Sequence, residues 1–141
     1  MRIVTALLFI SILALSSAPT AALAHARPAQ AEPAHESSVA SVTEIKIWFT
    51  QELTLRGNDI VVSDGAGNRV DNADARVDQD DPDRKLLRAT VQPLVDGLYT
   101  VTWTSSSAED GHPATDSYSF TVAGAAQDPA VSVCSDHAGP G

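Results

Sequence analysis

Apolar residues recur at every second position through most of the chain, and this period constrains the fold more than any other feature. In residues 42–50, Ile45, Ile47 and Phe49 alternate with polar or amphipathic neighbours, as in a half-buried strand. Further extended runs follow at residues 59–63, 86–91, 98–105 and 116–122, with one short candidate at 75–77. No segment shows helical periodicity, so we predict an all-β protein, an antiparallel β-sandwich of about seven strands.

Turn residues divide these runs. The glycines and Asx residues of residues 64–68 predict a hairpin that returns at Arg69 and Val70. Further along, Leu94, Gly97 and Tyr99 have the spacing of a tyrosine corner, in which the phenol hydroxyl bonds to upstream backbone in Greek-key sandwiches. The alternative for Tyr99 is an ordinary core aromatic.

The first 24 residues have the anatomy of a secretory signal peptide. Arg2 precedes an apolar run over residues 3–15, and Ala22-Leu23-Ala24 fits the small-x-small cleavage rule. The run is too short for a membrane span of about 20 residues, so we expect no membrane insertion of the mature chain. Cleavage after Ala24 would make His25 the first residue of one domain at residues 25–123, whereas cleavage after Ala26 would remove it.

Net charge limits the classes of ligand that the protein can bind, and cysteine content limits its disulfides. The formal net charge is −9, which disfavours nucleic acid and anionic lipid as ligands. The one cysteine, Cys134, cannot form an internal disulfide. With His137 it lies in a stretch rich in Gly, Pro and Ala, residues 124–141, which we expect to be a flexible tail. Incidental residues are the simplest interpretation of this pair. A thiolate site for Cu(I) and an intermolecular disulfide remain alternatives.

Two separated segments suggest a metal site. Asp110 and His112 lie two positions apart in a predicted interstrand loop, so both side chains can face one ion. Alone, Asp110-Gly111-His112 is equally typical of a turn with a solvated histidine. A mature N-terminal His25 would add an amine and an imidazole, and this set of nitrogen and oxygen donors suits Cu(II).

With these features in this order, the sequence resembles the CopC family of periplasmic copper-binding proteins. The resemblance is carried by His25-Ala26, Ala31-Glu32-Pro33-Ala34, residues 45–51, residues 70–72 and 74–77, Leu94, Gly97, Tyr99, Trp103, residues 107–112 and residues 118–122. It implies a cupredoxin-like Greek-key sandwich, also described as Ig-like, that binds one Cu(II) ion per chain through His25, Asp110 and His112. It also implies a periplasmic location and exchange of copper with an inner-membrane transport protein.

Other residues fit this resemblance less directly. Some family members carry a methionine-rich Cu(I) segment, but Met1 is the only methionine here. We expect His35 to be an exposed bystander, with accessory ligation as the alternative. Glu109 and Asp116 flank the loop and are candidates for hydrogen bonds to the ligating imidazoles.

The expected function is therefore copper homeostasis or resistance, by sequestering or delivering Cu(II), and not enzymatic catalysis. Two alternatives stay open. An N-terminal histidine brace also serves copper-dependent monooxygenases, and a metal-free secreted interaction module would use the same fold.

Overall fold

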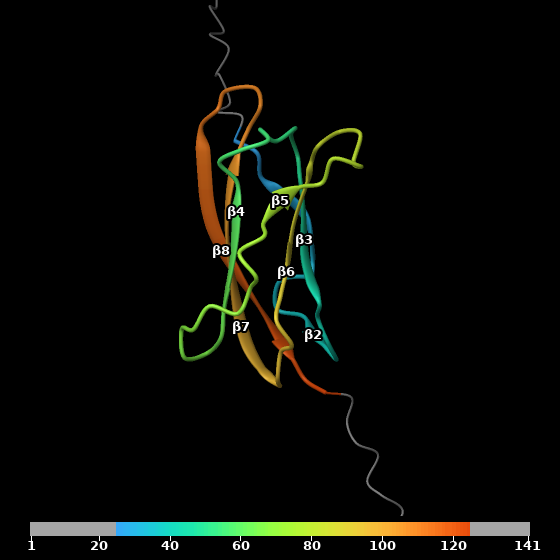
Figure 1. Cartoon of the computed structure of the whole chain (residues 1–141), viewed down its shortest axis with the longest axis vertical. Coiled ribbons are helices and arrows are strands. Elements are labelled where there is room, and N and C mark those ends of the chain that lie inside the picture. The colour runs from blue at the N-terminus through green and yellow to red at the C-terminus, as the bar shows by residue number, and fades with distance from the viewer. Residues whose placement is uncertain (1–24, 125–141) are drawn as a thin grey trace, which may run out of the picture.

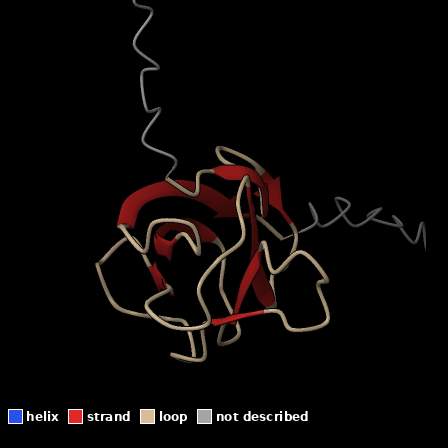
Figure 2. Cartoon of the chain, turned by 90° about the horizontal axis from the view of Figure 1, so that it is seen from above, coloured by secondary structure: helices blue, strands red, loops and turns tan. Residues whose placement is uncertain are grey.

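The computed structural model describes residues 25–124, which form eight strands in two sheets and contain no helix. Figures 1 and 2 show the strands as two facing layers. One sheet has the order β1-β3-β6-β5 and the other β2-β8-β7-β4. The strands are β1 (Pro28–Glu32), β2 (Ser38–Val39), β3 (Glu44–Phe49), β4 (Asp59–Ser63), β5 (Arg76–Val77), β6 (Leu86–Thr90), β7 (Gly97–Ser106) and β8 (Pro113–Val122).

The core lies between the sheets and follows from the alternation. In β3 the inward side chains Ile45, Ile47 and Phe49 are at most 2% exposed, whereas their neighbours are partly exposed. Burial of such side chains stabilises the fold by about 25 cal/mol per Å² of apolar surface removed from water. Phe49 meets Trp103 of the opposite sheet edge to face, with ring centroids 5.3 Å apart. This aromatic pair joins the two layers.

Tyr99 forms the predicted tyrosine corner. Its hydroxyl donates a 2.7 Å hydrogen bond to the carbonyl oxygen of Val95, four residues upstream. Its ring is 3% exposed and stacks on Phe120 of β8, with centroids 5.6 Å apart. The residue is therefore both a core aromatic and the anchor of the turn into β7.

The predicted all-β sandwich is confirmed, with differences in its strands. The 59–63 strand and the hairpin to Arg69 are present, and the Asp64 carboxylate accepts the turn amides of Ala66 and Asn68. The count is eight because β1 and β2 were not predicted, while the predicted return at Arg69 and Val70 forms only an isolated bridge between Ser63 and Arg69. β2 pairs with β8 in parallel, so one pairing departs from the antiparallel pattern. β8 begins at Pro113, three residues before the predicted start, because its first residues pair with β7 although they are mostly exposed.

Both the signal peptide expected at residues 1–24 and the pair Cys134 and His137 lie outside the described residues. So does the expected tail except for Gly124, whose amide donates to Asp96. Within residues 25–124 no helix has the length and apolarity needed to cross a membrane.

Candidate metal centre

The β7–β8 hairpin positions the Asp110-Gly111-His112 loop. Its two strands pair over ten successive positions, from Gly97–Val122 to Ser106–Pro113. Beyond the last pair, the Gly111 amide donates to the Ser107 carbonyl at 2.8 Å, and the Ser106 hydroxyl donates to the Gly111 carbonyl at 3.2 Å. Gly111 has a φ of 68°, a left-handed conformation that glycine adopts without strain. The loop is thus held by its own backbone.

Asp110 and His112 lie next to each other within this loop. That both face one ion, as their spacing suggests, stays a prediction. One carboxylate oxygen accepts the His112 amide at 3.1 Å, and the other lies 3.5 Å from His112 Nδ1. The side chain of Asp110 is 26% exposed and that of His112 is 69% exposed. The carboxylate is therefore fixed by the backbone, whereas the imidazole is free to turn toward a ligand.

The N-terminal segment reaches the same end of the sandwich. The Ser105 hydroxyl donates a 3.0 Å hydrogen bond to the buried carbonyl of Ala26. The Thr50 amide donates to the Arg27 carbonyl at 2.8 Å, and the Arg27 amide donates to the Thr50 side-chain hydroxyl at 3.2 Å. These contacts hold His25 close to the level at which β7 ends and β8 begins, and Figure 1 shows both segments at one end of the molecule.

His25 is the third predicted ligand. Its Nδ1 atom is buried and has no hydrogen-bond partner among the described residues, although buried polar atoms normally have one. Among residues 25–124 no three or more His, Cys, Asp or Glu side chains form a ready metal-binding cluster. The structure thus brings Asp110 and His112 together and places His25 at the same end, but it does not assemble the three as a closed site. The unpartnered nitrogen and the available nitrogen and oxygen donors fit a metal ion.

Sequence reasoning missed Gln51, which follows β3. Its Nε2 donates to the Glu109 carboxylate at 3.0 Å, while its Oε1 is buried and has no partner in the part of the chain that the structure describes. A glutamine after a strand gives no local signal that its side chain contacts a distant loop. The Asp116 carboxylate accepts the Ser117 amide at 2.8 Å. Both flanking acids therefore have partners of their own other than an imidazole.

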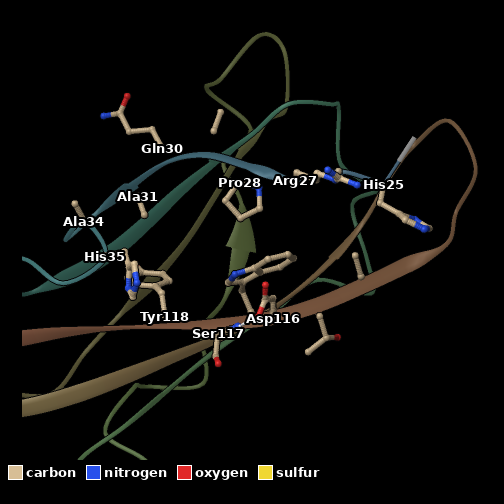
Figure 3. A pocket seen from close by; sticks show the side chains of 15 residues that line it. His25, Arg27, Pro28, Gln30, Ala31, Ala34, His35, Asp116, Ser117 and Tyr118 are labelled. Carbon is tan, nitrogen blue, oxygen red and sulfur yellow. Dashed lines mark hydrogen bonds between the residues drawn. The ribbon is translucent and has the colours of Figure 1, made fainter. Parts of the chain in front are cut away.

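His35 lies apart from the candidate centre. Its ring meets Tyr118 edge to face, with centroids 6.4 Å apart, and its Nε2 lies 3.7 Å from Glu36. Figure 3 shows His25 at one end of a groove and His35 with Tyr118 at the other. The side chain is 62% exposed, as expected for a bystander.

Fold and site together define a class, namely β-sandwich domains in which an N-terminal segment and a hairpin loop present imidazole and carboxylate groups at one end. Within that class the chain belongs to the CopC family, since the model of the CopC domain matches residues 29–123. The match contains Asp110 and His112 and begins four residues after His25. A search of curated protein sequences gave no match.

Solved structures agree with this assignment. The chain is similar to CopC from Methylosinus trichosporium OB3b, with 26% identity and a TM-score of 0.63, covering 70% of this chain and 93% of that one. It is also similar to PcoC, a methionine-rich copper resistance protein from Escherichia coli, with 28% identity and a TM-score of 0.59 over 71% of this chain and 100% of that one. These similarities confirm the sandwich fold.

Proposed function

We propose that this protein binds one Cu(II) ion as cargo through the amine and imidazole of His25, the carboxylate of Asp110 and the imidazole of His112. The observation that carries the proposal is the buried Nδ1 of His25, which has no hydrogen-bond partner within residues 25–124 and lies at the same end as the Asp110–His112 pair. Membership of the CopC family and similarity to a copper resistance protein supply the choice of metal.

The donor set favours Cu(II) over Cu(I). Two imidazoles, one amine and one carboxylate suit the tetragonal geometry of Cu(II), whereas Cu(I) prefers thiolate and thioether sulfur. The described residues contain neither Cys nor Met. A site of this kind supports sequestration or delivery of Cu(II) rather than electron transfer or catalysis.

The anchors explain how such a site would load. Asp110 and the Ala26 backbone are held in place before metal arrives, so they require little reorganisation. His112 is exposed and can rotate to complete the coordination. Because the amine and both imidazoles must lose protons before they coordinate, copper binding releases protons and weakens in acid.

The same proposal includes the cellular location of copper binding and the protein with which copper is exchanged. Residues 1–24 would direct export to the periplasm and leave His25 with a free amine. Copper would then be exchanged with an inner-membrane transport protein.

The experiment starts from protein whose first residue is His25, confirmed by mass spectrometry, and titrates Cu(II) against a competing chelator. We expect one ion per chain. His25→Ala, Asp110→Asn and His112→Ala should each weaken binding at least about tenfold, as loss of even an outer-shell partner can. One extra alanine before His25 blocks the chelating amine and should do the same. His35→Ala is the matched control and should bind normally.

Other outcomes would contradict the proposal. Undiminished Cu(II) binding by the alanine-extended protein would refute the N-terminal chelate, and no binding at all would favour the interaction module. Copper-loaded protein should also be incubated with a reductant, an oxidant and candidate glycans. Oxidised products that disappear in His25→Ala would establish a monooxygenase instead of a carrier.

A further inference from the structure

A groove of about 820 Å³ enters the sandwich between β1 of one sheet and the first half of β8 of the other. Figure 3 shows His25 at one end and the pair of His35 and Tyr118 at the other. The wall formed by β1 and the residues after it carries small side chains: Ala29, Ala31 and Ala34. Within residues 25–124 the two sheets are therefore open at this edge, and the inner face of β8 is accessible through it.

The pairing of β8 with β7 determines which side chains face the inside of the sandwich. The pairing is regular over ten positions, and Phe120 and Val122 are at most 2% exposed. Since side chains two positions apart share a face of a strand, Tyr118 and Asp116 also point between the sheets. Trp103 of β7 is the register partner of Asp116 and is 6% exposed. It therefore lies next to Asp116 on the same inner face.

Asp116 interrupts the apolar pattern of this inner face. The residues on either side of it in the inward row, Ala114 and Tyr118, pack against the hydrophobic core. One oxygen of Asp116 accepts the Ser117 amide at 2.8 Å, but within residues 25–124 the carboxylate forms no ion pair. Figure 3 shows Asp116 directed into the groove. A ligand that displaces water from this carboxylate must supply a positive charge, because an unpaired charge that loses its water is costly.

Two aromatic side chains of the groove add to the carboxylate. The Tyr118 hydroxyl is buried and has no hydrogen-bond partner among the described residues, although buried hydroxyls normally have one. Burial raises the pKa of this phenol, so the group is neutral and its oxygen can accept a hydrogen bond. Asp116 and Tyr118 are separated by about 7 Å along the strand. Trp103 lines the same groove and offers an aromatic surface, which attracts organic cations.

We propose that this groove binds a small organic molecule that carries a primary ammonium group on a short apolar stem. The ammonium donates to the Asp116 carboxylate and to the phenol oxygen of Tyr118, with the ring of Trp103 beside it. The stem packs against the small side chains of the β1 wall, among them Ala31 and Ala34. Largely apolar pockets of this size with a few convergent polar groups are typical of small-molecule sites.

Arg27 is a competitor for the same carboxylate. Among the described residues that line the groove it is the only Lys or Arg, and Figure 3 shows it near His25. Its backbone is held by Thr50, on the side of the groove opposite β8. If its guanidinium turned onto Asp116, it would take the place of the ammonium of the ligand. The experiment therefore includes a variant of Arg27.

The experiment titrates metal-free protein starting at His25 with 2-phenylethylamine and follows amide and indole signals by NMR. We expect saturable binding with a dissociation constant of about 1 mM or lower, typical of a ligand this small. The amide signals of residues 115–118 and the indole N–H signal of Trp103 should shift. The indole signal of Trp48, on the outer face of β3, is the internal control and should stay in place.

Comparison ligands and variants test each contact. 2-Phenylethanol has the same stem without the charge and should bind at least about tenfold more weakly. Asp116→Asn keeps the shape of the side chain, and it should weaken binding of the amine at least about tenfold while leaving binding of the alcohol unchanged. Tyr118→Phe should weaken binding of the amine about 2- to 10-fold. Asp80→Asn removes the same charge from an exposed residue outside the groove and should have no effect.

Three results would overturn the proposal. The first is equal affinity for the amine and the alcohol, or no saturable binding of either. The second is binding of the amine only by Arg27→Gln, which would show that Arg27 occupies the carboxylate in the unmodified protein. The third is tighter binding of a short lysine peptide with blocked ends, which would assign the ammonium to a protein partner. No titration contains copper, so failure would leave the proposed metal site unaffected.

Discussion

Ser105 connects the N-terminal segment to the β7–β8 hairpin, and its hydroxyl offers a way to weaken the proposed copper binding without changing any proposed ligand. The hydroxyl donates to the Ala26 carbonyl at 3.0 Å, across 79 positions of sequence. Ser105 is 0% exposed and Ala26 is 1% exposed. We predict that Ser105→Ala lowers Cu(II) affinity, because this bond holds the residue next to His25 beside the loop.

The size of the effect follows from the burial of the bond. An ordinary hydrogen bond contributes about 0.5–1.5 kcal/mol net, and a buried carbonyl left without a partner costs about 1–3 kcal/mol. In the variant the segment can detach so that water solvates the Ala26 carbonyl. Copper binding must then supply the free energy of docking the segment again. A penalty of about 1–2 kcal/mol corresponds to an affinity about 5- to 30-fold lower.

The assay is a competition titration of Cu(II) between the protein and a chelator at neutral pH. Thr102→Ala is the matched control, since it removes a hydroxyl from the exposed face of the same strand. Its affinity should equal that of the unmodified protein. Circular dichroism should show that both variants keep the β-sandwich.

Two results would refute this reasoning. Ser105→Ala with an unchanged affinity and an intact fold would show that the anchor does not position His25 for binding. An equal loss in Thr102→Ala would show that the effect is not specific to the Ala26 contact.

Three further predictions concern stability. Asp71→Ala should lower the free energy of unfolding, measured in urea, by about 2–4 kcal/mol. The reason is that this fully buried carboxylate accepts the Val62 and Ala73 amides and pairs with Arg69. The control Asp80→Ala changes an exposed residue and should alter the free energy of unfolding little. Burial alone raises the pKa of Asp71, but these partners outweigh it and lower the pKa. The stabilisation by Asp71 should therefore be complete above the unfolded pKa of about 3.9 and disappear as pH falls through the lower folded value. In acid the free energies of unfolding of the unmodified protein and of Asp71→Ala should converge. Tyr99→Phe should cost about 0.5–1.5 kcal/mol through loss of the bond to Val95, measured by urea unfolding. Cu(II) at a hundred times its dissociation constant should add about 2.7 kcal/mol, a gain that a chelator reverses and a calorimetric melt detects.

Strands whose faces differ in burial were predictable from the sequence. In β3, and in β7 as far as Trp103, the inward residues are β-branched or aromatic, so the period is visible in the residues themselves. β1 was not predicted because its residues, Pro28–Glu32, are mostly exposed and lack β-branched side chains. It is a strand because its backbone pairs with β3, and no local pattern records that pairing.

For the candidate site too, some features were predictable from the sequence and others were not. The spacing of Asp110 and His112 predicted that both side chains can face one ion. That they contact each other is a finding of the structure. The position of His25 depends on the long-range bond between Ser105 and Ala26, which local patterns do not encode. Likewise, the buried Oε1 of Gln51 becomes visible only when the end of β3 is placed against Glu109.

The long β7–β8 hairpin has a consequence for the order of folding. Its two strands are neighbours in sequence, and hairpins close within microseconds, whereas contacts between distant segments form more slowly. We expect the half of the centre that holds Asp110 and His112 to exist in early, partly folded chains. The segment around His25 reaches this hairpin only through a contact between residues 79 positions apart. On the proposed ligand set, a nascent chain would therefore present two donors before the third is in place.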